Sequence, residues 1–124
     1  MVKELEREPS GPAGAIWVLL DLDSRVQGGE GPESSAEYSV TIAASVAKRF
    51  LDTGKSVGLV ASGEARHIIR PEAGLGQTGR VLEALAIVEP GLAGTLEDAA
   101  VVVTSEMSKG ASVVIVSSAL VQDV

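Results

Sequence analysis

The chain alternates between short runs of apolar residues and longer amphipathic stretches, which are separated by loops rich in glycine and proline. Residues 15–22, 56–61 and 112–118 are apolar at most positions, a pattern typical of strands that are covered on both faces in α/β sheets. Residues 66–70 follow the second run after a short turn, and Pro71 ends them. We therefore expect these two segments to form an antiparallel hairpin at an edge of the sheet.

Three further segments carry apolar residues at helical spacing. Two of them open with capping boxes, formed by Ser34 with Glu37 and by Thr95 with Asp98, and a short helix over residues 81–88 lies between them. A glycine closes each of the two capped helices. The order of strands and helices predicts a three-layer α/β/α sandwich with right-handed crossovers, built on a mostly parallel sheet with an antiparallel edge strand.

Length and composition fit a single domain. A chain of 124 residues with 45 % apolar content can bury a core of that size. We expect residues 1–14 to be a charged lead-in and loop, and residues 15–124 to be the folded domain. The last apolar run lies close to the end of the sequence. We therefore expect a fragment of a larger protein, whose final strand lies at an open edge and pairs with a second copy to form a homodimer.

The charge balance narrows the classes of partner. Seventeen acidic against ten basic residues give a net charge of −7, which opposes binding to nucleic acid or to anionic lipid. There is no cysteine, so disulfides, thiolate metal sites and thiol nucleophiles are excluded. No apolar stretch reaches the ~18 residues that a membrane span needs, so we expect the chain as given to be soluble.

The first apolar run ends in Asp21-Leu22-Asp23, and its two carboxylates are the strongest candidates for function. Successive side chains of a strand alternate between faces, so Asp21 and Asp23 should point to the same side at the carboxyl end of the sheet, where such folds bind ligands. A structural role, in which Asp21 pairs with Arg25 or caps a loop, is open at this point.

The order of elements resembles the von Willebrand factor type A domain, whose three site loops correspond here to the end of the first strand, to residues 92–96 and to residues 113–118. More closely, residues 2–8, 17–23 and 43–47 resemble the bacterial family called domain of unknown function fifty-eight. The resemblance implies a Rossmann-like topology and a non-enzymatic adaptor role, with a MoxR-type AAA+ ATPase as partner. It also implies membrane-anchoring segments outside this chain, with this domain in the cytoplasm.

The type A resemblance also implies a metal-ion-dependent adhesion site, made of an Asp-x-Ser-x-Ser motif, a threonine and a late aspartate that supply oxygen ligands to Mg²⁺. Asp21 and Thr95 match this pattern, but Asp23 and Arg25 stand where the serines belong, and Ser118 stands where the aspartate belongs. An arginine there competes with a cation for the carboxylates. We therefore expect a degenerate site that binds a protein partner without a metal or another cofactor. The expected partner-binding residues are Asp21, Asp23, Ser24, Arg25, Thr95, Ser117 and Ser118.

Other kinds of chemistry compete with this interpretation. Leu19–Asp23 also resembles the Asp-x-Asp motif of haloacid-dehalogenase-type phosphatases, with Asp21 as nucleophile and Asp23 as general acid, but no paired acidic motif follows a later strand to hold Mg²⁺. Residues 74–79 match Gly-x-Gly-x-x-Gly, yet no strand directly precedes them, so we expect a flexible loop rather than a dinucleotide site. We interpret the lone His67 as a surface residue rather than a catalytic base.

Overall fold

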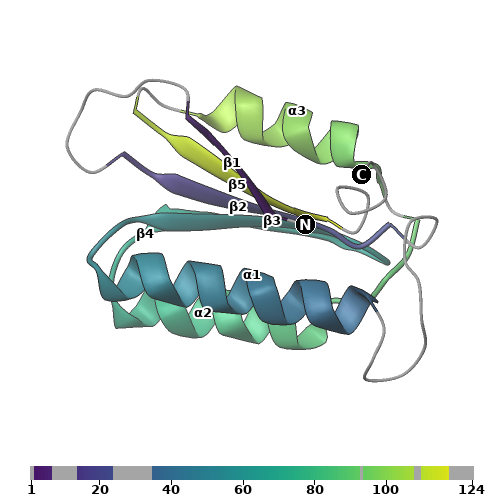
Figure 1. The fold of residues 1–124 in the computed structure, drawn as a ribbon, viewed down its shortest axis with the longest axis horizontal. Helices are drawn as coiled ribbons and strands as arrows, with labels where there is room; N and C mark the ends of the chain where they lie inside the picture. Colours follow the sequence, from purple (N-terminus) through teal and green to yellow (C-terminus); the bar gives the residue numbers. More distant parts are fainter. Residues whose placement is uncertain (1, 7–13, 24–34, 93, 108–109, 118–124) are drawn as a thin grey trace.

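The central feature of the fold is a five-stranded sheet with helices on both faces (Figure 1). The computed structural model describes residues 2–6, 14–23, 35–92, 94–107 and 110–117. In chain order the elements are β1 (Val2–Glu6), β2 (Ile16–Asp21), α1 (Ser35–Asp52), β3 (Val57–Ser62), β4 (Arg66–Glu72), α2 (Leu75–Ile87), α3 (Leu96–Glu106) and β5 (Ser112–Ser117). The strand order is β1-β5-β2-β3-β4, in which the three inner strands are parallel and both edge strands are antiparallel.

Strand β2 marks the point where the chain changes its direction of winding. Helix α1 leads from β2 to β3 on one side, and the chain later returns through α3 to β5 on the other side of β2. Helices α1 and α2 cover one face of the sheet, and α3 covers the other (Figure 1). The expected three-layer sandwich is thus confirmed. The carboxyl end of β2 lies at the topological switch point, the place where open α/β sheets bind ligands.

The apolar run of β2 is buried along its whole length because the two faces of the strand belong to two separate cores. Val18 and Leu20 belong to the core beneath α1 and α2, whereas Trp17 and Leu19 belong to the core beneath α3. All four residues are at most 1 % exposed. Even-numbered side chains of β2 therefore point toward α1 and α2, and odd-numbered ones point toward α3.

Gly54 follows α1 and a capping box opens α3 where the sequence predicts them, but α3 ends at Glu106, with Met107 as its C-cap, rather than at Gly110. Gly54 and Gly110 have positive φ angles of 85° and 78°, a left-handed conformation that glycine adopts without strain. Thr95 caps α3, and Asp98 completes the capping box. Ser34, the expected cap of α1, lies outside the described residues.

Strand β1 corrects the expectation that residues 1–14 are a lead-in and loop. Residues 2–6 pair antiparallel with β5, beginning with Val2 opposite Val116. Strand β5 therefore lies inside the sheet, between β1 and β2, and has no open edge for a second copy of the chain. The sequence could not show this because β1 is short and charged, and pairing between distant segments leaves no local signal.

Two other element bounds differ from the prediction. The glycine motif at residues 74–79 provides the N-cap and first turns of α2 and is not a flexible loop. Gln77 explains this early start, since its buried amide donates hydrogen bonds to the backbone oxygens of Val57 (2.7 Å) and Arg70 (2.9 Å). These tertiary bonds outweigh the low helix propensity of glycine. Strand β4 continues through Pro71, which an edge strand tolerates.

Candidate functional site

The carboxyl ends of the three parallel strands present a row of polar residues. In the strand register Asp21 lies between Ser62 of β3 and Ser117 of β5. Each takes the position that faces α3, because it continues the alternation of the core residues on its strand. All three residues are buried, with at most 2 % of their surface exposed. The row is therefore a polar end to the core beneath α3, at the switch point of the sheet.

Both carboxylate oxygens of Asp21 accept hydrogen bonds from the chain itself. The hydroxyl of Ser117 donates to Oδ2 (2.9 Å), and the backbone N–H of Asp23 donates to Oδ1 (3.0 Å). The second bond closes a turn in which an aspartate binds the backbone two residues on, so the interpretation that Asp21 caps a loop is confirmed. Together these bonds offset the cost of burying a carboxylate.

Asp23, the second carboxylate of the motif, anchors the segment that follows α2. It is 6 % exposed and forms an isolated parallel bridge with Gly91. The N–H of Gly91 donates in turn to the carbonyl oxygen of Leu22 (3.1 Å). The end of β2 is thus joined through the backbone to the α2–α3 connection.

The same segment is joined closely to the β3–β4 turn. The N–H of Glu64 donates to the carbonyl oxygen of Glu89 (2.8 Å). A Cβ at Gly63 would overlap that carbonyl oxygen, and a Cβ at Gly91 would overlap the backbone of Glu64. Glycine is required at both positions for this approach, so the two loops form one rigid junction.

The guanidinium of Arg66 lies at the rim of the polar row. Its Nε donates a long hydrogen bond to the hydroxyl of Ser62 (3.4 Å), and a Cβ at Gly94 would overlap Nη2. Arg66 thus lies between the end of β3 and the start of α3, and Gly94 leaves the space for it. The expected partner-binding residues include neither Arg66 nor Ser62, although Ser62 also stands where the phosphatase alternative would have its strand-end serine. Alternation along β3 could have found Ser62, since Val60 belongs to the core beneath α3.

Thr95 has a structural role at the start of α3. Its hydroxyl accepts a hydrogen bond from the N–H of Asp98, and Oδ2 of Asp98 accepts one from the N–H of Thr95, both at 3.1 Å. Hydrogen bonds join Asp21, Asp23 and Ser117, but not Thr95, into one group. The other expected site residues lie outside the described part of the chain: Ser24, Arg25 and Ser118.

Among the described residues, the oxygens that an adhesion-type metal site would use already have contacts within the chain. Both oxygens of Asp21 accept hydrogen bonds, and the hydroxyl of Thr95 caps α3. Arg66 already brings a positive charge to the rim. Within the residues that the structure describes, no group of three or more acidic, histidine or cysteine side chains is placed to hold a metal ion.

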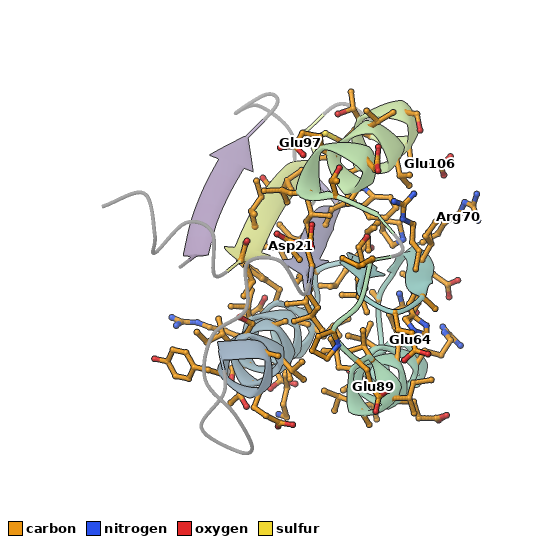
Figure 2. All side chains as sticks on the ribbon, turned by 90° about the vertical axis from the view of Figure 1, so that its right-hand side faces the viewer. Asp21, Glu64, Arg70, Glu89, Glu97 and Glu106 are labelled. Carbon is orange, nitrogen blue, oxygen red and sulfur yellow. The ribbon has the colours of Figure 1, made fainter. Side chains whose placement is uncertain are left out.

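Exposed carboxylates surround the polar row. Glu64 lies in the β3–β4 turn, Glu89 follows α2, and Glu97 lies in the first turn of α3. All three are exposed, and Figure 2 shows them with Asp21 in a view onto this end of the sheet. None of them forms an ion pair with another described residue. The described side chains at this end therefore carry more negative than positive charge, even with Arg66 at the rim, and such a balance favours positively charged groups.

The fold and this site define a class: a three-layer α/β domain with an internally hydrogen-bonded polar row at its switch point. Residues 1–124 match the family model described as Protein of unknown function DUF58, and the chain belongs to this family. No curated protein and no solved structure matches the chain. Among the helices of the described residues, none is long and apolar enough to cross a bilayer.

Proposed function

We propose that this domain is a non-enzymatic protein-interaction module that binds a basic surface of its partner through the carboxyl end of the sheet. The observation that carries the proposal is the contrast between two sets of carboxylates: the buried ones, called inner here, and the exposed ones, called outer. Asp21 and Asp23 are buried in contacts with the chain itself. Glu64, Glu89 and Glu97 face solvent and form no ion pair with the described residues. Rigidly held charges of one sign steer and orient a partner of opposite charge.

The contacts of Asp21 also bear on the alternative, a haloacid-dehalogenase-like phosphatase. In that chemistry an oxygen of Asp21 attacks phosphorus, so it needs a lone pair that is open to the substrate. Here each oxygen accepts one hydrogen bond, and because the residue is only 2 % exposed, a substrate has little access to the remaining lone pairs. These contacts favour the interaction role. The alternative predicts hydrolysis of an aryl phosphate in Mg²⁺ that Asp21→Asn abolishes, whereas the interaction role predicts none.

The partner that we propose is a MoxR-type AAA+ ATPase, which the family resemblance implies. The acidic end of the sheet restricts the surface that such a partner must offer, because a negative field selects lysine and arginine over aspartate and glutamate. The contact should therefore weaken as salt is added, since screening acts most strongly on exposed charges.

A binding measurement with a purified MoxR-type AAA+ ATPase tests the proposal. One variant changes Glu64, Glu89 and Glu97 together to glutamine, and we expect a loss of affinity of about tenfold at low salt. A matched control neutralises exposed acidic residues elsewhere on the surface: Glu72, Glu83 and Glu106. The control should bind within about twofold of the unaltered chain, since surface changes outside a contact have small effects.

Equal losses in the two variants would contradict the proposal, and so would binding that does not respond to salt. The inner carboxylates give a further test. Asp21→Ala with Asp23→Ala removes the carboxylate of Asp21, which accepts hydrogen bonds from Ser117 and from the N–H of Asp23. The loops beside the outer carboxylates should then be held less firmly, so binding should fall. Intact binding by this double variant, shown to be folded by circular dichroism, would rule out a role for the Asp21 region.

A further inference from the structure

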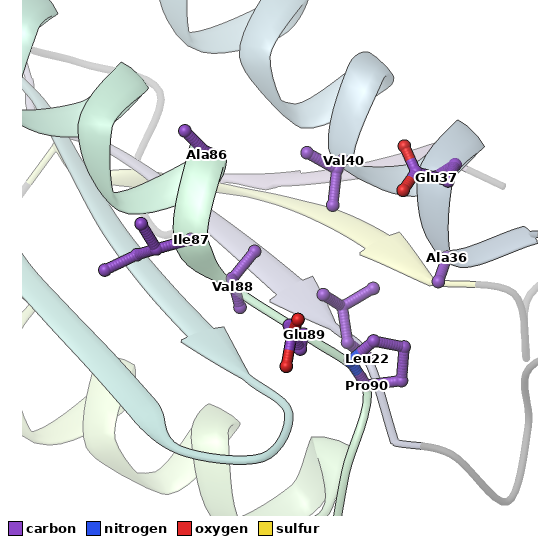
Figure 3. A pocket seen from close by; sticks show the side chains of 9 residues that line it. All are labelled: Leu22, Ala36, Glu37, Val40, Ala86, Ile87, Val88, Glu89 and Pro90. Carbon is purple, nitrogen blue, oxygen red and sulfur yellow. The ribbon is translucent and has the colours of Figure 1, made fainter. Parts of the chain in front are cut away.

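A pocket of about 330 Å³ opens at the carboxyl end of the sheet, on the face opposite the polar row (Figure 3). It lies between the first turns of α1 and the segment that follows α2. Most of its lining residues are apolar, among them Leu22, Val40 and Val88, but polar atoms, including those of Glu37 and Glu89, contribute much of its surface. Its volume is at the lower end of the roughly 300–1,000 Å³ of ligand sites, so it suits one or two side chains rather than a large cofactor.

The floor of the pocket is held rigidly. Leu22 is fully buried and belongs to the core beneath α1 and α2. Its N–H donates to the carbonyl oxygen of Ser62 (2.7 Å), and its own carbonyl oxygen accepts from the N–H of Gly91 (3.1 Å). Leu22 follows Asp21 directly, so the pocket and the polar row are fixed by the same stretch of backbone on opposite faces of the sheet.

The rim of the pocket combines apolar surface with negative charge. Ile87 is 68 % exposed, and Ala86 and Pro90 beside it are also exposed. The carboxylate of Glu89 lies at the same rim and forms no ion pair with a described residue. Apolar surface gains from burial, and the carboxylate gains from a cation beside it.

We infer that this pocket receives an aliphatic side chain of the partner protein, and that a lysine or arginine next to it in the partner sequence binds Glu89. The inference rests on the proposed function and specifies the segment that the partner inserts. A phosphate or carboxylate ligand is disfavoured because Glu89, which forms no ion pair with a described residue, would repel it. A second copy of the chain is disfavoured because it carries the same net charge of −7. In a basic segment with an aliphatic anchor, the aliphatic side chain would contact the apolar lining residues and the cation would contact Glu89 at the rim.

Three blocked pentapeptides separate these contributions. They are the acetylated and amidated sequences Gly-Lys-Leu-Lys-Gly, Gly-Lys-Gly-Lys-Gly and Gly-Glu-Leu-Glu-Gly, titrated into the ¹⁵N-labelled chain and followed by NMR. The first peptide should shift the amide signals of Val40, Val88 and Glu89 at millimolar concentration. The second lacks the anchor and the third lacks the cations, so both should bind at least about fivefold more weakly.

Two pairs of variants locate the site. Ala86→Phe fills the pocket from an exposed position and should abolish binding of the first peptide, whereas Ser45→Phe, at an exposed position of α1 outside the pocket, should leave it unchanged. Glu89→Gln should weaken binding about threefold or more, and Glu83→Gln, which removes the same charge from the exposed face of α2, should not.

Equal binding of the three peptides overturns the inference, and so does undiminished binding by the Ala86→Phe variant or a set of shifted signals elsewhere on the surface. Failure of all peptides to bind at millimolar concentration also overturns it. The proposed function is tested separately. The ATPase can lose affinity for the variant in which Glu64, Glu89 and Glu97 are glutamine, and yet bind the Ala86→Phe variant as tightly as the unaltered chain. That outcome would retain the acidic contact and reject the pocket.

Discussion

The two ends of the sheet use their charged residues differently. Near the amino ends of the parallel strands, exposed charges form ion pairs at 2.8–2.9 Å: Lys48 with Asp52, Arg70 with Glu106 and Arg80 with Glu72. At the carboxyl end, Glu64, Glu89 and Glu97 form no such pair with described residues. Surface ion pairs add little stability, so the difference is expected to have a small effect on folding. The amino end has three ion pairs beside Arg49 and Lys55, which are unpaired among the described residues, whereas the three carboxylates at the other end form no ion pair with described residues.

The ends also differ in what lies just inside the surface. Strands β2 and β3 begin with buried apolar residues, Ile16 and Val57, which lie opposite each other in the register. They finish with buried polar residues, Asp21 and Ser62. Burying polar groups is costly unless they are hydrogen-bonded. The carboxyl end therefore depends on a few specific contacts, whereas the amino end relies on apolar burial, and mutations can separate the two.

The largest effect should come from the junction that joins the carboxyl-end loops. Gly63→Val places side-chain atoms onto the carbonyl oxygen of Glu89, and we expect a loss of about 3 kcal/mol in the free energy of unfolding, measured in urea. Gly79→Ala is the control, because a Cβ there meets nothing and lies in the exposed part of α2. It should stabilise the chain by up to about 1 kcal/mol. A Gly63→Val variant as stable as the unaltered chain would show that the junction is loose.

A smaller effect is expected from two of the fully buried serines, Ser117 and Ser39. The hydroxyl of Ser117 donates to Asp21, so Ser117→Ala leaves a buried carboxylate oxygen with one donor fewer and should cost roughly 2 kcal/mol. The hydroxyl of Ser39 on α1 has no hydrogen-bond partner among the described residues. Ser39→Ala should therefore leave stability unchanged or raise it. If thermal melts showed equal losses for both variants, the hydrogen bond to Asp21 would not be what stabilises the carboxyl end.

Much of this architecture is predictable from the sequence, because it follows from local patterns. The apolar run that ends at Asp21 requires cover on both faces, and strand alternation together with parallel strand order places Ser117 next to Asp21. The capping box of Thr95 and the hairpin of β3 and β4 are equally local signals. The strand, cap and hairpin signals depend on residues that are close in sequence or that repeat with a fixed period. The contact of Ser117 with Asp21, 96 positions away, follows from the predicted order of parallel strands.

The features that the sequence did not predict depend on contacts between distant segments. Strand β1 exists through its pairing with β5, and α2 starts early because the Gln77 side chain binds two backbone oxygens outside the helix. Arg66 reaches the site through a side-chain contact with Ser62 and the space at Gly94. No local pattern encodes these contacts. The need for glycine at 63 and 91 also arises only in the folded chain, where the two loops lie too close together for a Cβ.

The smallest expected change in stability comes from neutralising the outer carboxylates. Its sign tests whether these carboxylates stabilise the fold or are spare for binding. Changing Glu64, Glu89 and Glu97 to glutamine relieves repulsion within a chain of net charge −7, so stability in low salt should rise slightly, by no more than about 0.5 kcal/mol. Changing Glu72 and Glu106 breaks two exposed ion pairs and should lower it by a similar amount. Both differences should shrink in thermal melts at high salt, because screening weakens exposed charges. A loss of stability on neutralising the carboxyl end would mean that its carboxylates have partners within the fold, and the amino and carboxyl ends would then no longer differ in the way that the proposed interaction requires.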